Sequence, residues 1–418
     1  MTVHGAGAHT PPPQVLSGLV VVDATRFLSG PYCTMILGDW GADVVKIEHP
    51  VNGDDSRAMA PLVNGESYPS AMVNRNKRSI ALDLKSPRGH EVAMELVRSA
   101  DVFVENFRPG VTQRLGLDYD TLKGANPGLV YCSVTGFGQT GPESHRAGFD
   151  IIAQGMTGFM RMTGEPGGGP AKFGVAVSDL SAGMTAAHAI LSSYIHRLRT
   201  GEGQYVDVSL VDAGLALTVW EAGAYFGEGV VPSPEGSRHR HNAPYQAFRT
   251  EDGFVTVGAN NERLWKRLCV DVLEQPDLLG REEYATNSAR VAHVDQLEEE
   301  LSEIFSQRTT GHWVEALDAA GVPGGPVLTY DQVLEQPQVR AREMILEVDH
   351  PRLGTIHMLG MPAKASRSPA RVRRPAPLLG QHTTEVLAGA GYDAETVQRL
   401  IEEGVAVQGE YPSGKEAR

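Results

Sequence analysis

Short apolar runs alternate with longer amphipathic segments over the first two hundred residues. The apolar runs predict buried strands, and the segments between them predict helices. The predicted strands cover residues 19–23, 43–48, 79–84, 101–105 and 128–134. Helices are expected from Pro31 to Gly41 and from Ser86 to Ala100, where a proline stands near each start. Strands that alternate with helices indicate an α/β fold with a parallel sheet flanked by helices.

The pattern changes in the second half of the chain. Residues 183–198 are apolar on nearly every face, which predicts a buried helix, and residues 204–210 alternate as a strand does. A second module begins near residue 225. The elements expected from there on are a hairpin over 244–258, helices near 261–272, 292–306 and 311–320, a hairpin-like stretch over 344–361 and a closing helix over 394–403. Both ends, 1–14 and 406–418, are expected to be flexible tails.

The composition is that of a soluble globular protein with more than one domain. Of the 418 residues, 41% are hydrophobic and 21% are charged. The net charge of -14 argues against nucleic acid as the main partner. No apolar run is long enough for a membrane span, and the start lacks the apolar core of a signal peptide. The widely spaced Cys33, Cys132 and Cys269 favour a reducing compartment over structural zinc, so we expect a cytoplasmic protein.

Polar segments follow the predicted strands, where ligands of parallel sheets bind. The segment after the first strand reads Phe-Leu-Ser-Gly-Pro-Tyr-Cys over residues 27–33, without the glycine fingerprint of dinucleotide-binding proteins. Residues 74–85 carry four cations and residues 106–114 carry two more. We expect both groups at the binding edge of the sheet, where they could pair with the phosphates of a nucleotide-tailed cofactor. Solvated surface charge is the alternative, and it is our interpretation of the Arg373-Arg374 pair.

Two aspartates precede apolar helical segments. Ser178 or Asp179 is expected to cap the helix that follows. The unpaired N–H groups and the helix dipole there would keep Asp179 ionised, and they could hold an oxyanion beside it. On local evidence a cap explains Asp179 more simply than a nucleophile does. Asp150 is either a second active-site carboxylate or a cap. No Ser lies in a GxSxG motif with a paired His, so a hydrolase triad has no support.

Several stretches together resemble the family III CoA-transferases, the group that includes formyl-CoA and carnitine CoA-transferases. They are residues 30–48, 76–85, 104–110, 200–204 and 377–383, and the likeness covers about residues 15–405. Within the family, residues 53–57, 244–248 and 378–384 look most similar to succinyl-CoA–dicarboxylate transferases. The resemblance implies an enzyme, a transferase of sulfur-containing groups, that moves CoA from a donor acyl-CoA to a carboxylic acid. Coenzyme A enters as part of the substrate, and no metal or redox cofactor is implied.

The resemblance also implies which residues act. The family's nucleophile falls on Asp179, which would form a mixed anhydride and an aspartyl-CoA thioester in turn. The implied CoA-binding positions are Arg26, Phe27, Leu28, Ser29, His49, Leu82, Asp83, Leu84, Lys85, Asn106, Phe107, Arg108 and Arg114. Arg26 and His49 stand where formyl-CoA transferases carry His and Arg. We add Arg146 to this set because of its place beside Asp150, our second catalytic candidate.

The implied architecture is an interlocked homodimer. Each chain would have a large Rossmann-like domain over residues 15–224, a smaller α+β domain over 225–330 and a C-terminal part, 331–405, that completes the large domain. The same fold hosts 2-methylacyl-CoA racemases, which carry Gly-His-Asp where this chain has Gly148-Phe149-Asp150. Phe149 cannot move a proton, so we favour a transferase. A non-catalytic CoA-binding protein is the other alternative.

The formyl enzymes carry a run of glycines over the active site. We recognise no such run in this chain, and residues 258–261 are only a loose counterpart. Oxalate and formate are therefore the less favoured substrates.

Overall fold

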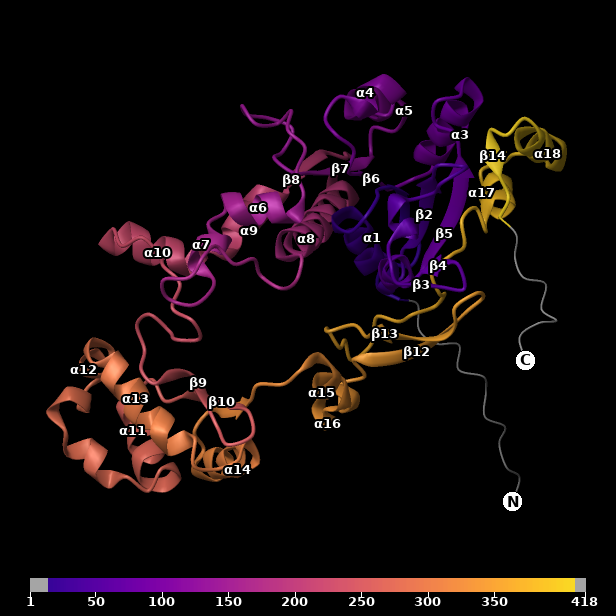
Figure 1. Ribbon diagram of the computed structural model, residues 1–418. Helices are drawn as coiled ribbons and strands as arrows, with labels where there is room; N and C mark the ends of the chain where they lie inside the picture. The colour runs from indigo at the N-terminus through magenta and orange to yellow at the C-terminus, as the bar shows by residue number, and fades with distance from the viewer. Residues whose placement is uncertain (1–13, 410–418) are drawn as a thin grey trace, which may run out of the picture. The chain divides into compact units, whose positions relative to one another are not determined.

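The computed structural model describes residues 14–409, which form two compact units (Figure 1). Unit 1 takes in the described residues up to Thr157, Phe173–Phe226 and the chain from Arg340 onward. Unit 2 takes in Gly158–Lys172 and Gly227–Val339. The chain thus leaves unit 1 and returns to it twice.

A seven-stranded sheet forms the centre of unit 1, in the order β14-β5-β2-β1-β6-β7-β8. Six of its strands are parallel to one another. They are β1 (Val20–Ala24), β2 (Asp43–Glu48), β5 (Lys77–Leu82), β6 (Val102–Glu105), β7 (Val130–Thr135) and β8 (Tyr205–Ser209). The edge strand β14 (Ala406–Val407) is antiparallel to β5. The predicted parallel sheet is confirmed, because each predicted apolar run coincides with one of these strands.

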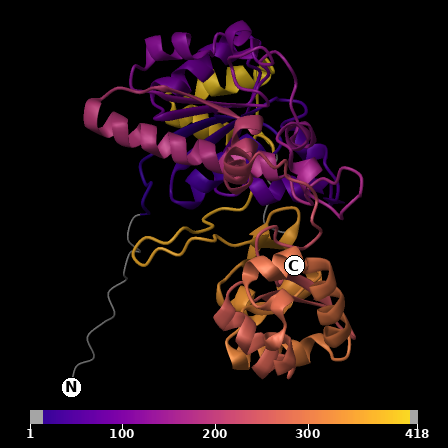
Figure 2. The same cartoon turned by 90° about the vertical axis from the view of Figure 1, so that its left-hand side faces the viewer.

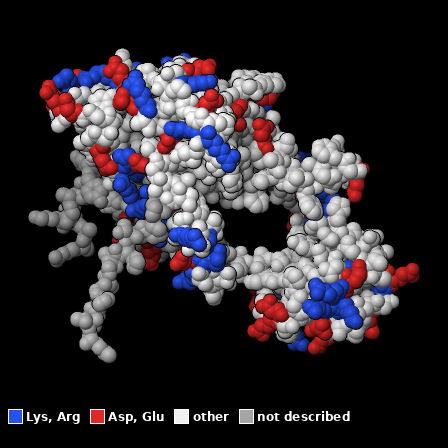
Figure 3. Space-filling view, turned by 180° about the vertical axis from the view of Figure 1, so that it is seen from behind, with Lys and Arg blue, Asp and Glu red and all other residues white. Residues whose placement is uncertain are grey.

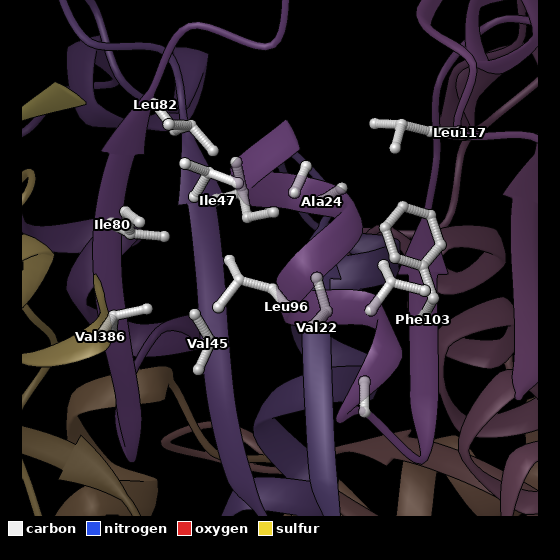
Figure 4. Packing of buried hydrophobic residues seen from close by; sticks show 14 of the residues in the cluster. Val22, Ala24, Val45, Ile47, Ile80, Leu82, Leu96, Phe103, Leu117 and Val386 are labelled. Atoms are coloured by element: carbon white, nitrogen blue, oxygen red, sulfur yellow. The ribbon is translucent and has the colours of Figure 1, made fainter. Parts of the chain in front are cut away.

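Helices cover both faces of the sheet (Figure 2). On one face, α1 (Ser29–Asp39) and α8 (Val177–Thr200) share an apolar core with α6 (Asp150–Met156) and α9 (Leu210–Leu217). On the other face, α3 (Pro87–Arg98), α5 (Tyr119–Ala125), α17 (Thr383–Gly389) and α18 (Ala394–Glu402) bury the core shown in Figure 4. The further helices of unit 1 are α2 (Tyr68–Val73), α4 (Val111–Leu115) and α10 (Val219–Glu228). Two hairpins complete it, β3–β4 (Leu62–Val63 and Glu66–Ser67) and β12–β13 (Ile345–His350 and Gly354–Leu359).

Unit 2 has an antiparallel sheet of three strands with its own apolar core. The strands are β9 (Tyr245–Arg249), β10 (Phe254–Gly258) and β11 (Gly324–Pro326), so the hairpin predicted over 244–258 is confirmed. The helices that pack on it or follow it are α11 (Glu262–Arg267), α12 (Asn287–Ala292), α13 (Val294–Phe305), α14 (Thr310–Ala320) and α15 (Tyr330–Glu335). The short helix α7 (Phe159–Met162) also belongs to this unit, and α16 (Pro337–Ala341) follows α15.

The flexible tails were predicted too long where the structure describes them. Gln14 donates a hydrogen bond to the carbonyl oxygen of Asp39 at 3.0 Å, and Ala406 is buried as part of β14. Two residues of strand are too short for a pattern to predict. The rest of the predicted tails, residues 1–13 and 410–418, lies outside the described residues. Within 14–409, no helix is both long and apolar enough to cross a membrane.

Three cations expected at the binding edge lie at the opposite edge of the sheet. Because β5 begins at Lys77, Arg75, Lys77 and Arg78 stand at its amino end. Arg75 pairs with Asp39 at 2.7 Å and Arg78 with Asp43 at 2.6 Å, so both are engaged in ion pairs away from the predicted binding edge. Of the four cations in residues 74–85, only Lys85 follows the strand.

Arg373 is exposed, as expected of surface charge, but it also has a structural role. Its guanidinium donates to the carbonyl oxygens of Gly38 and Ala42, both at 2.8 Å, and so ties the returning chain to the end of α1. Elsewhere, basic and acidic side chains are interspersed over the face of the molecule in Figure 3.

Two fully buried lysines neutralise the acids beneath the carboxyl edge of the sheet. Lys77 Nζ lies 3.0 Å from Asp23 Oδ2, and Lys46 Nζ lies 2.9 Å from Asp54 Oδ2. Lys46 also donates to the carbonyl oxygen of Thr25 at 2.7 Å. Burial alone would raise the pKa of Asp23, but the charges of Lys77 and Lys46 outweigh it and lower the pKa to about 2. The turn that leads from β1 into α1 is therefore built on a compensated ionic network.

Removing one lysine from this network should destabilise the protein strongly. We expect Lys77→Met to lower the free energy of unfolding by about 3–5 kcal/mol, because the buried Asp23 loses its ion-pair partner and keeps only the weaker effect of Lys46. Arg399→Met is the matched control: it breaks an exposed pair with Glu395 and should change stability by no more than about 0.5 kcal/mol. Urea denaturation measures both. A loss in Lys77→Met no larger than that of the control would contradict the role given to the network.

Candidate active site

The predicted CoA-binding residues follow the carboxyl ends of four adjacent strands. Leu82 is the last residue of β5, and Asp83, Leu84 and Lys85 come directly after it. His49 follows β2, residues 26–29 follow β1, and residues 106–108 follow β6. Arg114 lies on α4, just beyond the last of these turns. The structure therefore brings the predicted set, apart from Arg146, to one edge of the sheet.

The turns after β1 and β6 are joined by direct contacts. The backbone N–H of Arg26 donates to Asn106 Oδ1, and Asn106 Nδ2 donates to the carbonyl oxygen of Arg26, both at 2.8 Å. The Arg26 guanidinium lies 5.4 Å from the centre of the Phe107 ring, a cation–π distance. Arg26, Asn106 and Phe107 thus form one cluster.

The turn after β1 is unusually tight at Phe27. Its φ of 62° lies in the left-handed region, which a residue with a bulky side chain rarely adopts. Its N–H donates to Asp54 Oδ1 at 3.0 Å, and Asp54 is in turn held by Lys46. The ionic network therefore fixes the direction in which the chain enters α1.

Of the other predicted residues, some are fixed by hydrogen bonds or by burial, and three are cations without an ion pair. Asp83 is held through its N–H, which donates to Val405, and His49 Nδ1 accepts from the N–H of Val51 at 3.2 Å. Leu82 is buried and Leu84 packs against the core, so both would meet a ligand mainly through their backbone. The exposed cations Lys85, Arg108 and Arg114 make no ion pair with any described residue. They are available for an anionic ligand.

Asp179 lies in the first turn of α8, and the predicted cap is wrong. The helix begins at Val177, two residues earlier than expected, and its N-cap residue is Ala176. The N–H of Ser178 donates to Asp150 Oδ1 at 2.9 Å, so the cap comes from α6 instead. The Asp179 carboxylate makes no hydrogen bond or ion pair with the part of the chain that the structure describes. It is half-buried and unpartnered.

The expected low pKa of Asp179 is also wrong. Burial, followed by the nearby charge of Asp150, raises the pKa of Asp179 to about 7. The donors expected to lower it are mostly in use: Ser178 donates to Asp150, and Leu180 donates to Ala176 at 3.0 Å. A carboxylate with a raised pKa is more basic, and pKa values shifted by burial and a like charge are typical of catalytic groups.

Asp150 positions the segment that carries Asp179. Its Oδ2 accepts from Gln154 Nε2 at 2.6 Å, one turn along α6. Gln154 is fully buried, and its Oε1 accepts from the N–H of Phe173 at 2.8 Å. Asp150 and Gln154 therefore clamp both ends of residues 173–178, and Asp150 acts as a cap for α8. Sequence reasoning missed Gln154, although its place four residues after an Asp on a helix was a usable signal.

A glycine allows α8 to approach α1 closely. A Cβ on Gly183 would lie 2.6 Å from the carbonyl oxygen of Ser29 and 3.1 Å from the Tyr32 ring. Asp179 stands one helical turn before Gly183, on the same side of α8. The face of α8 that carries Asp179 is therefore the one packed against the start of α1, and α1 begins directly after the Arg26 turn.

Arg146 does not join the site. Its guanidinium pairs with Glu143 at 2.5 Å and lies 4.9 Å from the centre of the Phe137 ring, and no contact connects it to Asp150. Arg146 was predicted beside Asp150 only because the two residues are close in the sequence.

Sequence reasoning also missed a run of glycines. Residues 167–169 are three consecutive glycines in unit 2, on the segment between α7 and α8. Because this run lies in unit 2 and Asp179 lies in unit 1, the lower preference for oxalate and formate stays a prediction.

The site can support covalent transfer to an anionic substrate. It offers an unpaired carboxylate with a pKa of about 7 and, at the sheet edge, three unpaired cations. Across residues 14–409, no three His, Cys, Asp or Glu side chains gather as ligands for a metal ion.

Comparison with known proteins gives one family. The profile of the family described as CoA-transferase family III matches residues 16–383. Succinyl-CoA:glutarate CoA-transferase of Homo sapiens is 39% identical over 397 residues, covering 94% of this chain and 90% of that protein. Acetyl-CoA:oxalate CoA-transferase of Acetobacter aceti is 40% identical over 350 residues, covering 84% and 88%. A crystal structure of a CAIB/BAIF family protein from Brucella suis superposes with a TM-score of 0.82 at 38% identity, covering 91% of this chain and all of that one.

The close approach at Gly183 can be tested by adding one methyl group. We expect Gly183→Ala to destabilise the protein by about 1–3 kcal/mol, because the Ser29 carbonyl is backbone and cannot move aside cheaply. Gly124→Ala in α5 is the matched control: a Cβ there meets nothing within 4 Å, and alanine is favoured over glycine within a helix. Thermal unfolding measures both. Equal midpoints in the two variants would show that α8 does not rest on α1 as described.

Proposed function

Since this chain belongs to CoA-transferase family III, we propose that it moves CoA from succinyl-CoA to a dicarboxylic acid, with Asp179 as the nucleophile. It is a CoA-transferase, and acyl-CoA and carboxylic acids are its substrates. The observation that carries the role of Asp179 is its unpartnered carboxylate at the start of α8, on the face packed against α1. The human relative's name supports succinyl-CoA as the donor and a dicarboxylate as the acceptor.

In the proposed reaction, CoA passes first from the donor acid to Asp179 and then from Asp179 to the acceptor acid. Asp179 attacks the thioester carbonyl of the donor, the C–S bond breaks, and CoA leaves as a thiolate from a mixed anhydride. The thiolate attacks the Asp179 carbonyl of that anhydride and releases the donor acid, which leaves an aspartyl-CoA thioester. The acceptor carboxylate then attacks this thioester, and CoA leaves again. The returning thiolate attacks the acceptor carbonyl, which forms the new acyl-CoA and frees Asp179.

The residues around Asp179 divide the remaining work. Asp150 holds the first turn of α8 in place through Ser178, and its charge adds to the burial that raises the pKa of Asp179. Among the first-turn donors, the N–H of Asp179 has no acceptor among the described groups, so it is available to the oxyanion of each tetrahedral adduct. No step needs a general base, because every attacking group is already an anion.

The sheet edge is the proposed CoA site. Lys85, Arg108 and Arg114 are the cations that would meet the phosphates, since no carboxylate of the described chain pairs with them. Arg26, held over Phe107 and paired with the exposed Asp55 at 3.5 Å, is a fourth candidate. A surface pair of that length is weak and would yield to a phosphate.

The acceptor acid is proposed at the level of its class. By their names, the human relative acts on glutarate and the Acetobacter relative on oxalate, and both acids are dicarboxylates of different length. A panel of acids incubated with succinyl-CoA, with products read by mass spectrometry, would identify the acceptor. Transfer to monocarboxylates alone would refute the proposed class.

An interlocked homodimer is the proposed assembly. The predicted burial of α8 on nearly every face is wrong for the chain by itself, since Leu198 is 68% exposed, and on α10 Trp220 and Phe226 are 74% and 83% exposed. Large apolar side chains left exposed on helices are typical of a surface that a partner covers. In this arrangement residues 331–405 complete the large domain of residues 15–224. Light scattering should give twice the chain mass of 44.9 kDa, and a monomeric mass would refute the proposal.

The activity should depend on the ionised form of Asp179. We expect kcat/KM to rise with pH through about 7, because the pKa of Asp179 is raised to that value and only the carboxylate attacks. Asp150→Asn removes the neighbouring charge, so the rise should move to lower pH.

Replacing the nucleophile should abolish most of the activity. We expect Asp179→Asn to lose at least about a thousandfold in kcat, while circular dichroism shows that the fold is kept.

Two results would contradict this role. Full transfer by Asp179→Asn would show that another group is the nucleophile. Deuterium uptake at C2 of a 2-methylacyl-CoA without any acceptor acid would instead support the racemase chemistry of the same fold.

A further inference from the structure

A row of polar side chains crosses three strands just below the proposed CoA site. The strand register pairs Glu105 of β6 with Ser133 of β7, and Ser133 with Asp207 of β8. Glu105 is only 2% exposed, and Ser133 is fully buried. The mechanism uses none of these groups. A buried acid that has no cation partner among the described residues is costly, so its place in the fold calls for a reason.

The row holds two turns at the carboxyl edge of the sheet. Glu105 Oε2 accepts from the N–H of Phe107 at 2.8 Å, in the turn after β6. Asp207 Oδ2 accepts from the N–H of Gln139 at 2.9 Å, and Gln139 Nε2 donates to Ser133 Oγ at 2.8 Å, in the turn after β7. Glu105 is therefore the side chain that fixes the backbone of Phe107.

Phe107 connects Glu105 to the cations of the edge. The Phe107 ring lies under the Arg26 guanidinium, and the preceding Asn106 is bonded to the Arg26 backbone in both directions. The unpaired Arg108 follows in the same turn. A change at Glu105 would therefore be felt at three of the proposed CoA-binding residues.

Among residues 14–409, no cation is paired with Glu105. The titratable groups that interact with it are Tyr131 and Cys132 of β7 and Tyr205 and Asp207 of β8, all neutral or acidic. Burial is the main cause that raises the pKa of Glu105, and the charge of Asp207 adds to it. Hydrogen bonds lower the pKa in part, and the result is a pKa of about 7. Protonation near neutral pH removes the charge but leaves an oxygen that accepts from Phe107.

We propose that Glu105 is a positioning residue of the CoA site, which fixes the turn of Asn106, Phe107 and Arg108 and whose charge weakens the hold of that turn on an anionic ligand. This inference rests on the proposed function, since the ligand is the phosphate-bearing part of CoA. Ionised Glu105 places a negative charge beneath the cations that meet the phosphates, whereas protonated Glu105 keeps the turn and adds no charge.

Glu105→Gln separates the charge from the hydrogen bond. The amide oxygen still accepts from Phe107, but the side chain cannot ionise. CoA affinity is measured by titration calorimetry at pH 6 and pH 8. We expect affinity in the unmodified protein to fall about fivefold more between these pH values than in Glu105→Gln. Titration of the CoA phosphates and of Asp179 occurs in both proteins and cancels in the comparison.

Glu105→Leu removes the hydrogen bond as well. We expect KM for acyl-CoA to rise about tenfold, with kcat within about twofold, because the turn is released and Asp179 is untouched. Asp207→Asn is the control: it alters the other acid of the row, which is exposed and does not contact Phe107, and KM at pH 6 should stay within about threefold. A general loss of structure would instead lower kcat in both variants.

The outcomes separate this inference from the proposed function. If CoA binds to neither protein at either pH, the proposed CoA site is wrong. If CoA binds to the unmodified protein and to Glu105→Gln with the same pH dependence, the role given to the charge of Glu105 is overturned and the CoA site stands. An unchanged KM in Glu105→Leu overturns the positioning role.

Discussion

Two buried lysines hold the carboxyl edge of the sheet in shape, and the candidate site depends on them. Lys77 compensates Asp23 and Lys46 compensates Asp54, all four without access to water. Burying charges is unfavourable unless each is paired and hydrogen-bonded, so these groups constrain one another's positions. Asp54 in turn fixes Phe27, Phe27 directs the chain into α1, and α1 meets α8 at Gly183. The position of Asp179 follows from this sequence of contacts.

The sheet itself could be predicted, because buried parallel strands appear in sequence as apolar runs, and runs such as 43–48 match β2 to the residue. The predictions failed where a residue's role depends on a contact with a residue far away in the sequence. The cap of α8 comes from Asp150, and Lys77, inside a run with charged neighbours, is buried only because Asp23 faces it. The residues predicted for CoA by resemblance to the family lie together at this edge, whereas Arg146, which was added from its sequence position alone, does not. The role of Glu105 was not predicted, because the sequence does not show that an acid at the end of a strand will be buried without a cation beside it.

The site combines unpaired cations with acids whose pKa is raised. Lys85, Arg108 and Arg114 lack carboxylate partners, while Asp179 and Glu105 lack cation partners, and burial raises the pKa of both acids to about 7. Keeping these charges apart leaves the cations available to phosphates and the Asp179 carboxylate basic enough to attack a thioester. Asp23 and Asp54, which lie beneath the same edge, show the opposite arrangement, because each is paired with a buried lysine.

The central claim is that Asp179 becomes covalently acylated during transfer. Its most direct test is to incubate the protein with succinyl-CoA, add hydroxylamine during turnover and map the modified peptides by mass spectrometry. Hydroxylamine converts an aspartyl anhydride or thioester into a stable hydroxamate. The account predicts a hydroxamate on Asp179 that depends on succinyl-CoA and is absent from Asp179→Asn. Continued CoA transfer with no hydroxamate on Asp179, or with one on a different residue, would contradict it.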